Sequence, residues 1–289
     1  MDSLSELRKR VQAPVRRYND VAGILVGDRV SIHVTRVFVA CKLSPTVATL
    51  SFLFFGLFGS ILLLFGGWIA AAGFGCLFLY YIFDCVDGEV ARYYGREKLI
   101  WGFHDFMFHL YVKSAFFVCL GIYAVRATGE PWVFLFALSG LLASLFTKFL
   151  YDVSLILTCR YVLLRGKVER EHYVSQIVPA ERCAGGGGDA DADSEPQHFR
   201  GFLPLLRTAA TNFDLAILLF FAAAVADVFL EPIPLFGLVA DAKILLVILY
   251  GVLLPLDFLD RLRSHLRRNS FFVDARELLH RAHDFQLWR

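Results

Sequence analysis

Apolar residues along the chain fall into six long runs that polar segments separate. The runs cover roughly residues 47–65, 68–90, 103–125, 132–157, 213–230 and 235–256. A helix needs about 20 apolar residues to cross the hydrocarbon core of a bilayer. The pattern therefore predicts six transmembrane helices, and an even number of spans returns both termini to the same side.

The segments that flank these runs are amphipathic. The pair Ser3 and Glu6 has the spacing of a helix N-terminal capping box. Apolar residues then alternate with basic ones at helical spacing, both here (Leu4, Leu7, Val11, Val15) and in the tail (Leu259, Leu262, Leu266). We expect residues 1–44 and 258–289 to form amphipathic segments on the membrane surface. They would flank a six-span domain over residues 45–257.

The longest polar stretch inside that domain is the connection over residues 160–208. It contains four consecutive glycines, 185–188, followed by alternating acidic residues. This composition is typical of a flexible linker, which we place at residues 184–196.

Composition narrows the class of protein further. Of the 289 residues, 57% are hydrophobic and only 19% are charged, and the mean hydropathy is +0.57. These values exclude a disordered chain, a disulfide-rich scaffold and a water-soluble globule. We therefore expect an all-α integral membrane protein, with six transmembrane helices and amphipathic juxtamembrane helices at both termini.

The charged residues are distributed unevenly between the two sets of connections. Residues 1–44, the connection between the second and third runs, residues 159–208 and residues 258–289 together hold 25 Lys and Arg residues, whereas the opposite connections hold only Arg126 and Lys243. Cytoplasmic connections carry the excess of positive charge in membrane proteins. This predicts a multi-pass protein with both termini and the long connection in the cytoplasm.

Polar residues within the second and third runs form two helical stripes. Asp84, Asp87, Gly88, Ala91 and Arg92 share one face of the second predicted helix, while Trp101, Asp105, His109 and Lys113 recur every fourth residue in the third. Ionisable residues inside a membrane are costly and point to function. If the two helices pack as a hairpin, three carboxylates and a histidine meet near the cytoplasmic interface.

Such a group of ligands is suited to a metal ion. Carboxylate oxygens gathered without cysteine favour Mg²⁺ or Mn²⁺, and one or two ions would fit. Each residue alone has an ordinary interpretation: surface carboxylates at a helix end, a snorkelling arginine, a hydrogen-bonded histidine. Their coincidence on two facing helices favours a functional site.

These residues also form a recognisable motif. Asp84-x-x-Asp87-Gly88-x-x-Ala91-Arg92, eight further residues, and then Trp101-x3-Asp105-x3-His109 resembles the signature of the CDP-alcohol phosphatidyltransferase family, D-x-x-D-G-x-x-A-R-x8-G-x3-D-x3-D. The match covers 26 residues. The sequence departs from the signature where Trp101 replaces a glycine, although Gly102 is adjacent, and where His109 replaces the last aspartate.

The resemblance implies an enzyme of phospholipid or related phosphodiester synthesis. Such enzymes transfer a phospho-alcohol group from a CDP-linked donor to an alcohol acceptor and release CMP. The resemblance implies that Asp84, Asp87 and Asp105 hold the metal, that His109 binds metal and accepts the acceptor's proton with Asp105, and that Gly88, Ala91 and Arg92 form the nucleotide and phosphate pocket. It further implies a homodimer and at least one lipid substrate; we expect no nucleic-acid partner.

Other polar residues carry weaker signals. Lys148 and Asp152 are four residues apart on the fourth run, and we include Lys148 as a substrate contact. Lys113 could bind phosphate, Asn212 and Asp214 could select the acceptor, and three residues before the first run could border the pocket: His33, Thr35 and Arg36.

Two other functions stay open on the sequence alone. A six-span transporter could use the same carboxylates to bind a cation in transit, although carriers place such sites near the bilayer midplane. The histidine at position 109 also leaves room for a catalytically inactive family member. The motif serves the CDP half of the donor, so it does not say which substrate carries the lipid.

Overall fold

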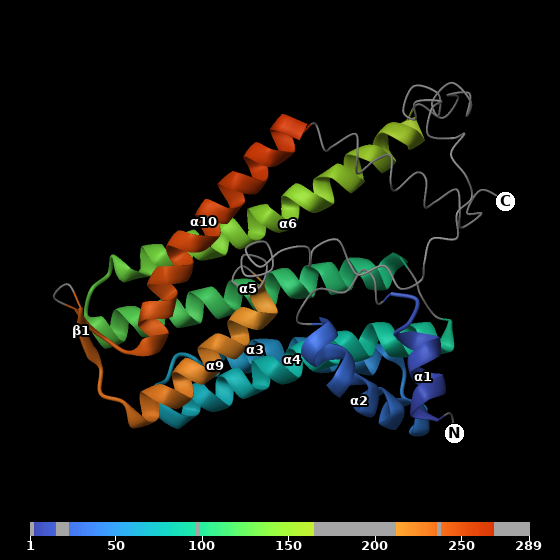
Figure 1. The fold of residues 1–289 in the computed structure, drawn as a ribbon, viewed down its shortest axis with the longest axis horizontal. Helices are drawn as coiled ribbons and strands as arrows, with labels where there is room; N and C mark the ends of the chain where they lie inside the picture. Colours follow the sequence, from blue (N-terminus) through green and yellow to red (C-terminus); the bar gives the residue numbers. More distant parts are fainter. Residues whose placement is uncertain (1–2, 16–22, 96–98, 165–211, 236–237, 269–289) are drawn as a thin grey trace. The chain divides into compact units, whose positions relative to one another are not determined.

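α-Helices make up nearly all of the part of the chain that the computed structural model describes, which comprises residues 3–15, 23–95, 99–164, 212–235 and 238–268 (Figure 1). The eight α-helices of these residues are α1 (Leu4–Val11), α2 (Asp28–Ala40), α3 (Pro45–Leu62), α4 (Gly67–Tyr94), α5 (Leu99–Thr128), α6 (Val133–Leu164), α9 (Phe213–Phe229) and α10 (Ala242–Arg268). A π-helical turn, η2 (Gly23–Gly27), precedes α2, and strands β1 (Ile233–Leu235) and β2 (Leu238–Ala240) form a small antiparallel sheet. The prediction of an α-helical fold is confirmed for the described residues, apart from this hairpin.

In the part of the chain that the structure describes, five helical segments are long and apolar enough to cross a membrane. They are Pro45–Leu62, Gly67–Tyr94, Phe103–Thr128, Val133–Leu150 and Ala242–Ser264, so the chain is a multi-pass helical membrane protein by length and composition. The fifth predicted span corresponds to α9, which is apolar but has only 17 residues. At 1.5 Å per residue it rises about 26 Å, less than the roughly 30 Å of a hydrocarbon core.

The last predicted span has different boundaries in the structure. Leu235 is the last residue of strand β1, residues 238–240 form strand β2, and α10 begins only at Ala242. This helix then continues through Pro255 to Arg268, so the predicted division at residues 257 and 258 falls inside one helix. Hydropathy cannot distinguish a short apolar strand from the first turn of an apolar helix, which explains the difference.

Helices α3 and α4 pack side by side because glycines face each other across their interface (Figure 1). A Cβ atom added at Gly59 would lie 2.7 Å from the carbonyl oxygen of Gly73, and one added at Gly73 would lie 2.8 Å from that of Gly59. Small residues allow such close approach of backbones in membrane helices. The left-handed conformation of Gly95, with φ of 60°, then ends α4 just before the connection to α5.

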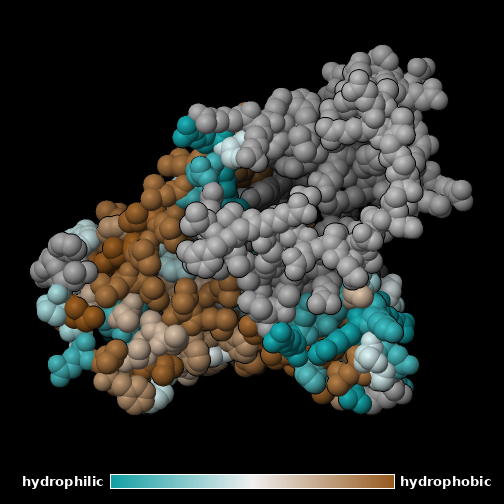
Figure 2. All heavy atoms as spheres, in the orientation of Figure 1, coloured by the Kyte–Doolittle hydropathy of each residue, from teal (hydrophilic) through white to brown (hydrophobic). Residues whose placement is uncertain are grey.

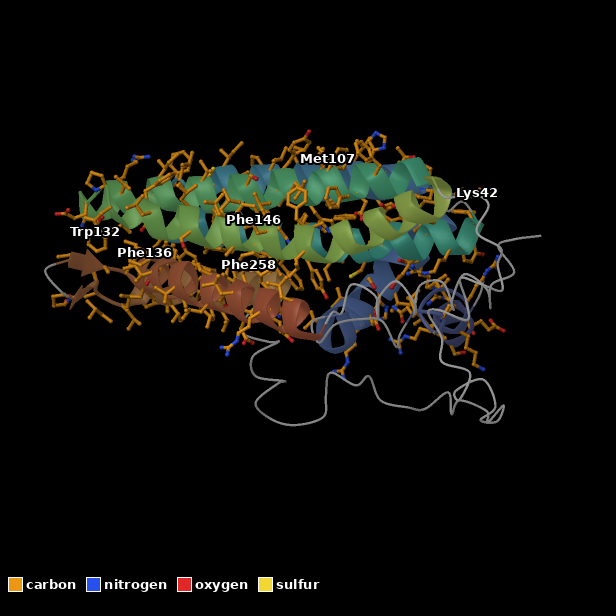
Figure 3. The ribbon with its side chains drawn as sticks, turned by 90° about the horizontal axis from the view of Figure 1, so that it is seen from above. Lys42, Met107, Trp132, Phe136, Phe146 and Phe258 are labelled. Carbon is orange, nitrogen blue, oxygen red and sulfur yellow. The ribbon has the colours of Figure 1, made fainter. Side chains whose placement is uncertain are left out.

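The chain divides into two compact units. The first comprises residues 1–141 and 195–253, and the second residues 142–194 and 254–289, so α6 and α10 contribute to both. In the first unit α4 contacts α1, α2, α3 and α9. In the second unit, the ring centroids of Phe146 on α6 and Phe258 on α10 are 5.9 Å apart (Figure 3).

The N-terminal helix α1 is amphipathic, as predicted, but its apolar face is covered by protein. The predicted capping box is present, with the Ser3 hydroxyl accepting from the Glu6 amide and the Glu6 carboxylate accepting from the Ser3 amide. Leu7 and Val11 are buried against Ile32 of α2. Hydrophilic residues gather on the surface around α1 and α2, whereas hydrophobic residues cover α9 (Figure 2).

A buried ion cluster joins α5, α9 and the start of α10. The Lys243 ammonium, 1% exposed, lies 2.5 Å from a carboxylate oxygen of Asp227 and 2.9 Å from one of Asp241. The Tyr123 hydroxyl donates to Asp241 at 2.5 Å. Both carboxylates also accept backbone N–H groups from the first turn of α10, so the cluster both caps α10 and fixes it to its neighbours.

Candidate functional site

Asp84, Asp105 and His109 converge between helices α4 and α5. The Nε2 atom of His109 lies 3.1 Å from Oδ1 of Asp84 and 3.4 Å from Oδ1 of Asp105. One ligand atom from each residue lies within 4.8 Å of the other two. The packing of the two helices thus brings together three of the four residues that the sequence predicts as metal ligands.

Local helix geometry places these side chains. Asp105 and His109 are one turn apart on α5 and so share a face, while Asp84 faces them from α4. The side chains of Asp84, Asp105 and His109 are 29%, 41% and 19% exposed. The group is therefore partly exposed, and all three residues lie in candidate membrane spans.

Tyr80 holds the histidine from the opposite side of its ring. The Tyr80 hydroxyl lies 2.6 Å from Nδ1 of His109, so both ring nitrogens have partners. Tyr80 is 1% exposed, and Phe52, which is fully buried, packs against the rings of both residues at 5.5 and 5.4 Å. Tyr80 is not among the residues predicted from the sequence, although its position one turn before Asp84 on the same helix face is a usable signal.

Asp87 lies one turn beyond Asp84 but is held by α3. Its carboxylate accepts a hydrogen bond from the Thr49 hydroxyl at 2.8 Å, and Thr49 is buried. Among the described residues, the group of ligand atoms around His109 does not include Asp87. Its role as a metal ligand stays a prediction.

Arg92 bends back over the helix that carries it. Its Nε donates to the carbonyl oxygen of Val11 at the end of α1, at 2.6 Å. A Cβ atom added at Gly88 would lie 3.1 Å from a guanidinium nitrogen of Arg92, so the space that Gly88 leaves is next to this cation. Ala91, also predicted to line the pocket, is half-buried on the same helix.

Glu89 is a buried carboxylate that was not among the predicted site residues. It is 2% exposed and accepts hydrogen bonds from Gln12 at 2.7 Å, Ser31 at 2.6 Å and Thr35 at 2.5 Å. These donors come from the segment after α1 and from α2. Glu89 therefore fixes the N-terminal helices onto the part of α4 that carries the motif. Thr35, predicted to border a pocket, serves this contact.

The remaining predicted residues lie outside the Asp84, Asp105 and His109 group. The Lys113 ammonium lies over the ring of Phe213 at 5.1 Å, and the side chain of Asn212 accepts from the Leu215 amide at the start of α9. Lys148 belongs to the second unit, and its role as a substrate contact stays a prediction. His33 and Arg36 are exposed on α2. The side chains of Trp101, Asp152 and Asp214 and the linker over 184–196 fall outside what the structure describes.

The donor set of the group fits a divalent ion. Octahedral Mg²⁺ holds its ligands at 2.0–2.1 Å, which places neighbouring ligand atoms about 3 Å apart. The two distances around Nε2, 3.1 and 3.4 Å, are close to this spacing. The same distances also suit a protonated histidine held between two carboxylates, so a binding measurement has to separate the two states.

Comparison with known proteins assigns no family to the chain. No family model matches the sequence, and no curated protein matches it. What is established is a helical membrane protein with several candidate spans and an Asp–Asp–His group between two of them.

Proposed function

We propose that this chain is an integral membrane transferase that moves a phospho-alcohol group from a CDP-linked donor to an alcohol acceptor and releases CMP. The observation that carries the proposal is the group formed by Asp84, Asp105 and His109. These residues belong to one 26-residue motif but come from two helices, and the folded chain brings their ligand atoms together. The resemblance of that motif to the CDP-alcohol phosphatidyltransferase signature supplies the reaction.

The metal-binding residues of this proposal are the two aspartates and the histidine, with Asp87 next to them on α4. Mg²⁺ or Mn²⁺ at such a site supplies a Lewis acid that polarises the phosphoryl oxygens of a diphosphate. The carboxylates would hold the cation, whose charge would offset the negative charge that they otherwise direct at the donor phosphates.

The proposed transfer forms one bond to phosphorus and breaks another. The acceptor hydroxyl oxygen forms a bond to the phosphorus that carries the donor's alcohol, and the bond from that phosphorus to the bridging oxygen breaks, so CMP leaves with the electron pair. Asp105 is the most exposed of the three groups, and we assign its second carboxylate oxygen as the acceptor of the hydroxyl proton. A histidine nitrogen that binds metal has no lone pair left for a proton, so the two roles predicted for His109 exclude each other.

Arg92 and Gly88 are the phosphate-binding part of the proposal. The guanidinium of Arg92 is anchored through Nε to Val11 and lies beside Gly88. A cation held next to a glycine gives phosphate oxygens close access to both charge and backbone. The location of the group within membrane spans lets a water-soluble nucleotide meet a lipid substrate, and we extend the proposal to a cytoplasmic site and a homodimer.

The test is release of CMP by the purified protein from a panel of CDP-alcohols, each offered with lipid and soluble acceptors. We expect turnover with one donor class, and loss of that turnover both in excess EDTA and in Asp84→Asn, because each empties the metal site. The matched control is Glu130→Gln, which removes an exposed carboxylate between α5 and α6 and should keep wild-type turnover. Absence of CMP from every donor, or full activity of Asp84→Asn, would overturn the proposal.

A further inference from the structure

We propose that the pair Tyr80 and His109 makes this site select a first-row transition ion such as Mn²⁺ over Mg²⁺, with Tyr80 acting as a positioning residue for the imidazole. The inference rests on the metal site of the proposed function. It goes further because it commits to the nature of the ion and to one role for His109, that of a ligand through Nε2.

The selectivity follows from the chemistry of the donors. Mg²⁺ is a hard ion that binds oxygen ligands and keeps much of its water. First-row transition ions accept imidazole nitrogen as well, and Mn²⁺ among them also suits carboxylates. Because His109 contributes Nε2 beside Oδ1 of Asp84 and Oδ1 of Asp105, the set has one nitrogen and two oxygens.

Tyr80 keeps that nitrogen directed at the carboxylates. When Nε2 binds a metal, the ring proton must be on Nδ1, which then donates to the Tyr80 oxygen 2.6 Å away. When Nε2 carries the proton instead, the same hydroxyl rotates and donates to Nδ1. A hydroxyl is the group that serves both states, so the ring keeps its orientation whether or not an ion is bound.

Packing removes the alternative ring positions. Phe52 lies against the imidazole and against the ring of Tyr80, and the Tyr80 and His109 rings meet edge to face at 5.8 Å. Phe52 and Tyr80 are both almost fully buried. A histidine ligand held in this way needs little reorganisation when an ion arrives, and loss of such an outer hydrogen bond typically lowers metal affinity by 10–100-fold.

Electron paramagnetic resonance of Mn²⁺ tests the inference on the purified full-length protein, without reference to turnover. Titration gives the Mn²⁺ affinity, competition with Mg²⁺ gives the selectivity, and ¹⁴N coupling to bound Mn²⁺ reports an imidazole ligand directly. We expect ¹⁴N coupling in the wild type and its loss in His109→Asp. In that variant the preference for Mn²⁺ over Mg²⁺ should fall to that of a site with oxygen ligands alone.

The Tyr80→Phe variant tests the positioning role. It leaves every ligand in place and should weaken Mn²⁺ binding about 10–100-fold while the ¹⁴N coupling of the bound ion remains. Tyr123→Phe is the matched control, since it likewise removes one tyrosine hydroxyl from the first unit, but one that donates to Asp241 rather than contacting His109. It should keep the wild-type affinity, and circular dichroism of each variant checks that the helices are retained.

The outcomes separate the inference from the function beneath it. Bound Mn²⁺ without ¹⁴N coupling, or an unchanged selectivity in His109→Asp, overturns the ligand role while a metal-dependent transferase still stands. Wild-type Mn²⁺ affinity in Tyr80→Phe overturns the positioning role. If neither ion binds and no donor yields CMP, His109 is an ion-pair partner of the aspartates, and the proposed function fails together with the inference.

Discussion

Replacing Glu89 with alanine should release the N-terminal helices from α4 without unfolding the rest of the protein. The carboxylate is buried and is the common acceptor for Gln12, Ser31 and Thr35. The change removes this acceptor and leaves the three donors facing an apolar side chain. Gln12 retains a second acceptor, the carbonyl oxygen of Asp28, at 2.8 Å.

The free-energy cost of Glu89→Ala therefore comes from Ser31 and Thr35, which are both fully buried. A buried donor without a partner costs about 1–3 kcal/mol, which gives about 2–6 kcal/mol for the pair. Hydroxyls on a helix can turn to the carbonyl oxygen four residues earlier, and this favours the lower limit. About 2 kcal/mol corresponds to roughly a 30-fold increase in the local opening of α1 and α2.

Hydrogen–deuterium exchange measured by mass spectrometry is the direct assay. Peptides from residues 4–12 and 28–40 should exchange about 30-fold faster in Glu89→Ala, whereas peptides from α3 should keep their protection. Glu89→Gln retains one carbonyl oxygen as acceptor and should show a smaller effect. Glu130→Ala, at an exposed position, serves as the control.

A specific result would refute the reasoning. If residues 28–40 keep wild-type protection in Glu89→Ala, the apolar contacts of α1 and α2 hold these helices without the carboxylate. Loss of protection throughout the chain would show instead that Glu89 supports the whole fold rather than the docking of its N-terminal part.

Three further predictions concern packing and topology. Lys243→Met leaves two buried carboxylates without their cation and should lower the free energy of unfolding by about 3–5 kcal/mol, which a lower midpoint of thermal unfolding in detergent would show. Adding Asp227→Asn should recover part of the loss. An unchanged midpoint in the single variant would show that the ion cluster is not stabilising. Gly73→Ala forces α3 and α4 apart and should lower the midpoint of thermal unfolding. Gly75→Ala is the control and should not, because its added Cβ meets no atom within 4 Å. Equal effects of the two variants would show that Gly73 is not needed for the close packing of α3 and α4. The charge distribution predicts that the long connection lies in the cytoplasm, so Gly186→Cys in a cysteine-depleted variant should resist an impermeant thiol reagent in intact cells. Labelling from outside would contradict this predicted topology.

Periodicity and composition were enough to predict the membrane class, most of the helices and the polar faces of α4 and α5. Apolar runs define spans because the bilayer sets their length, and this holds for α3, α4, α5 and α6. The spacing of Asp105 and His109 predicts a shared face because an α-helix repeats every 3.6 residues. The capping box of Ser3 and Glu6 could also be predicted, because both partners lie within one helical turn.

Only the tertiary structure decided which side chains meet across helices. Sequence spacing gives the direction of a residue on its own helix, but not the rotation and depth at which that helix packs against another. That rotation turns Asp87 to Thr49 of α3, places Tyr80 behind His109 and buries Glu89 against α2. The hairpin before α10 could not be predicted from the sequence for a related reason. Its strands are as apolar as a membrane span, and their antiparallel pairing is a contact between two segments rather than a property of either one.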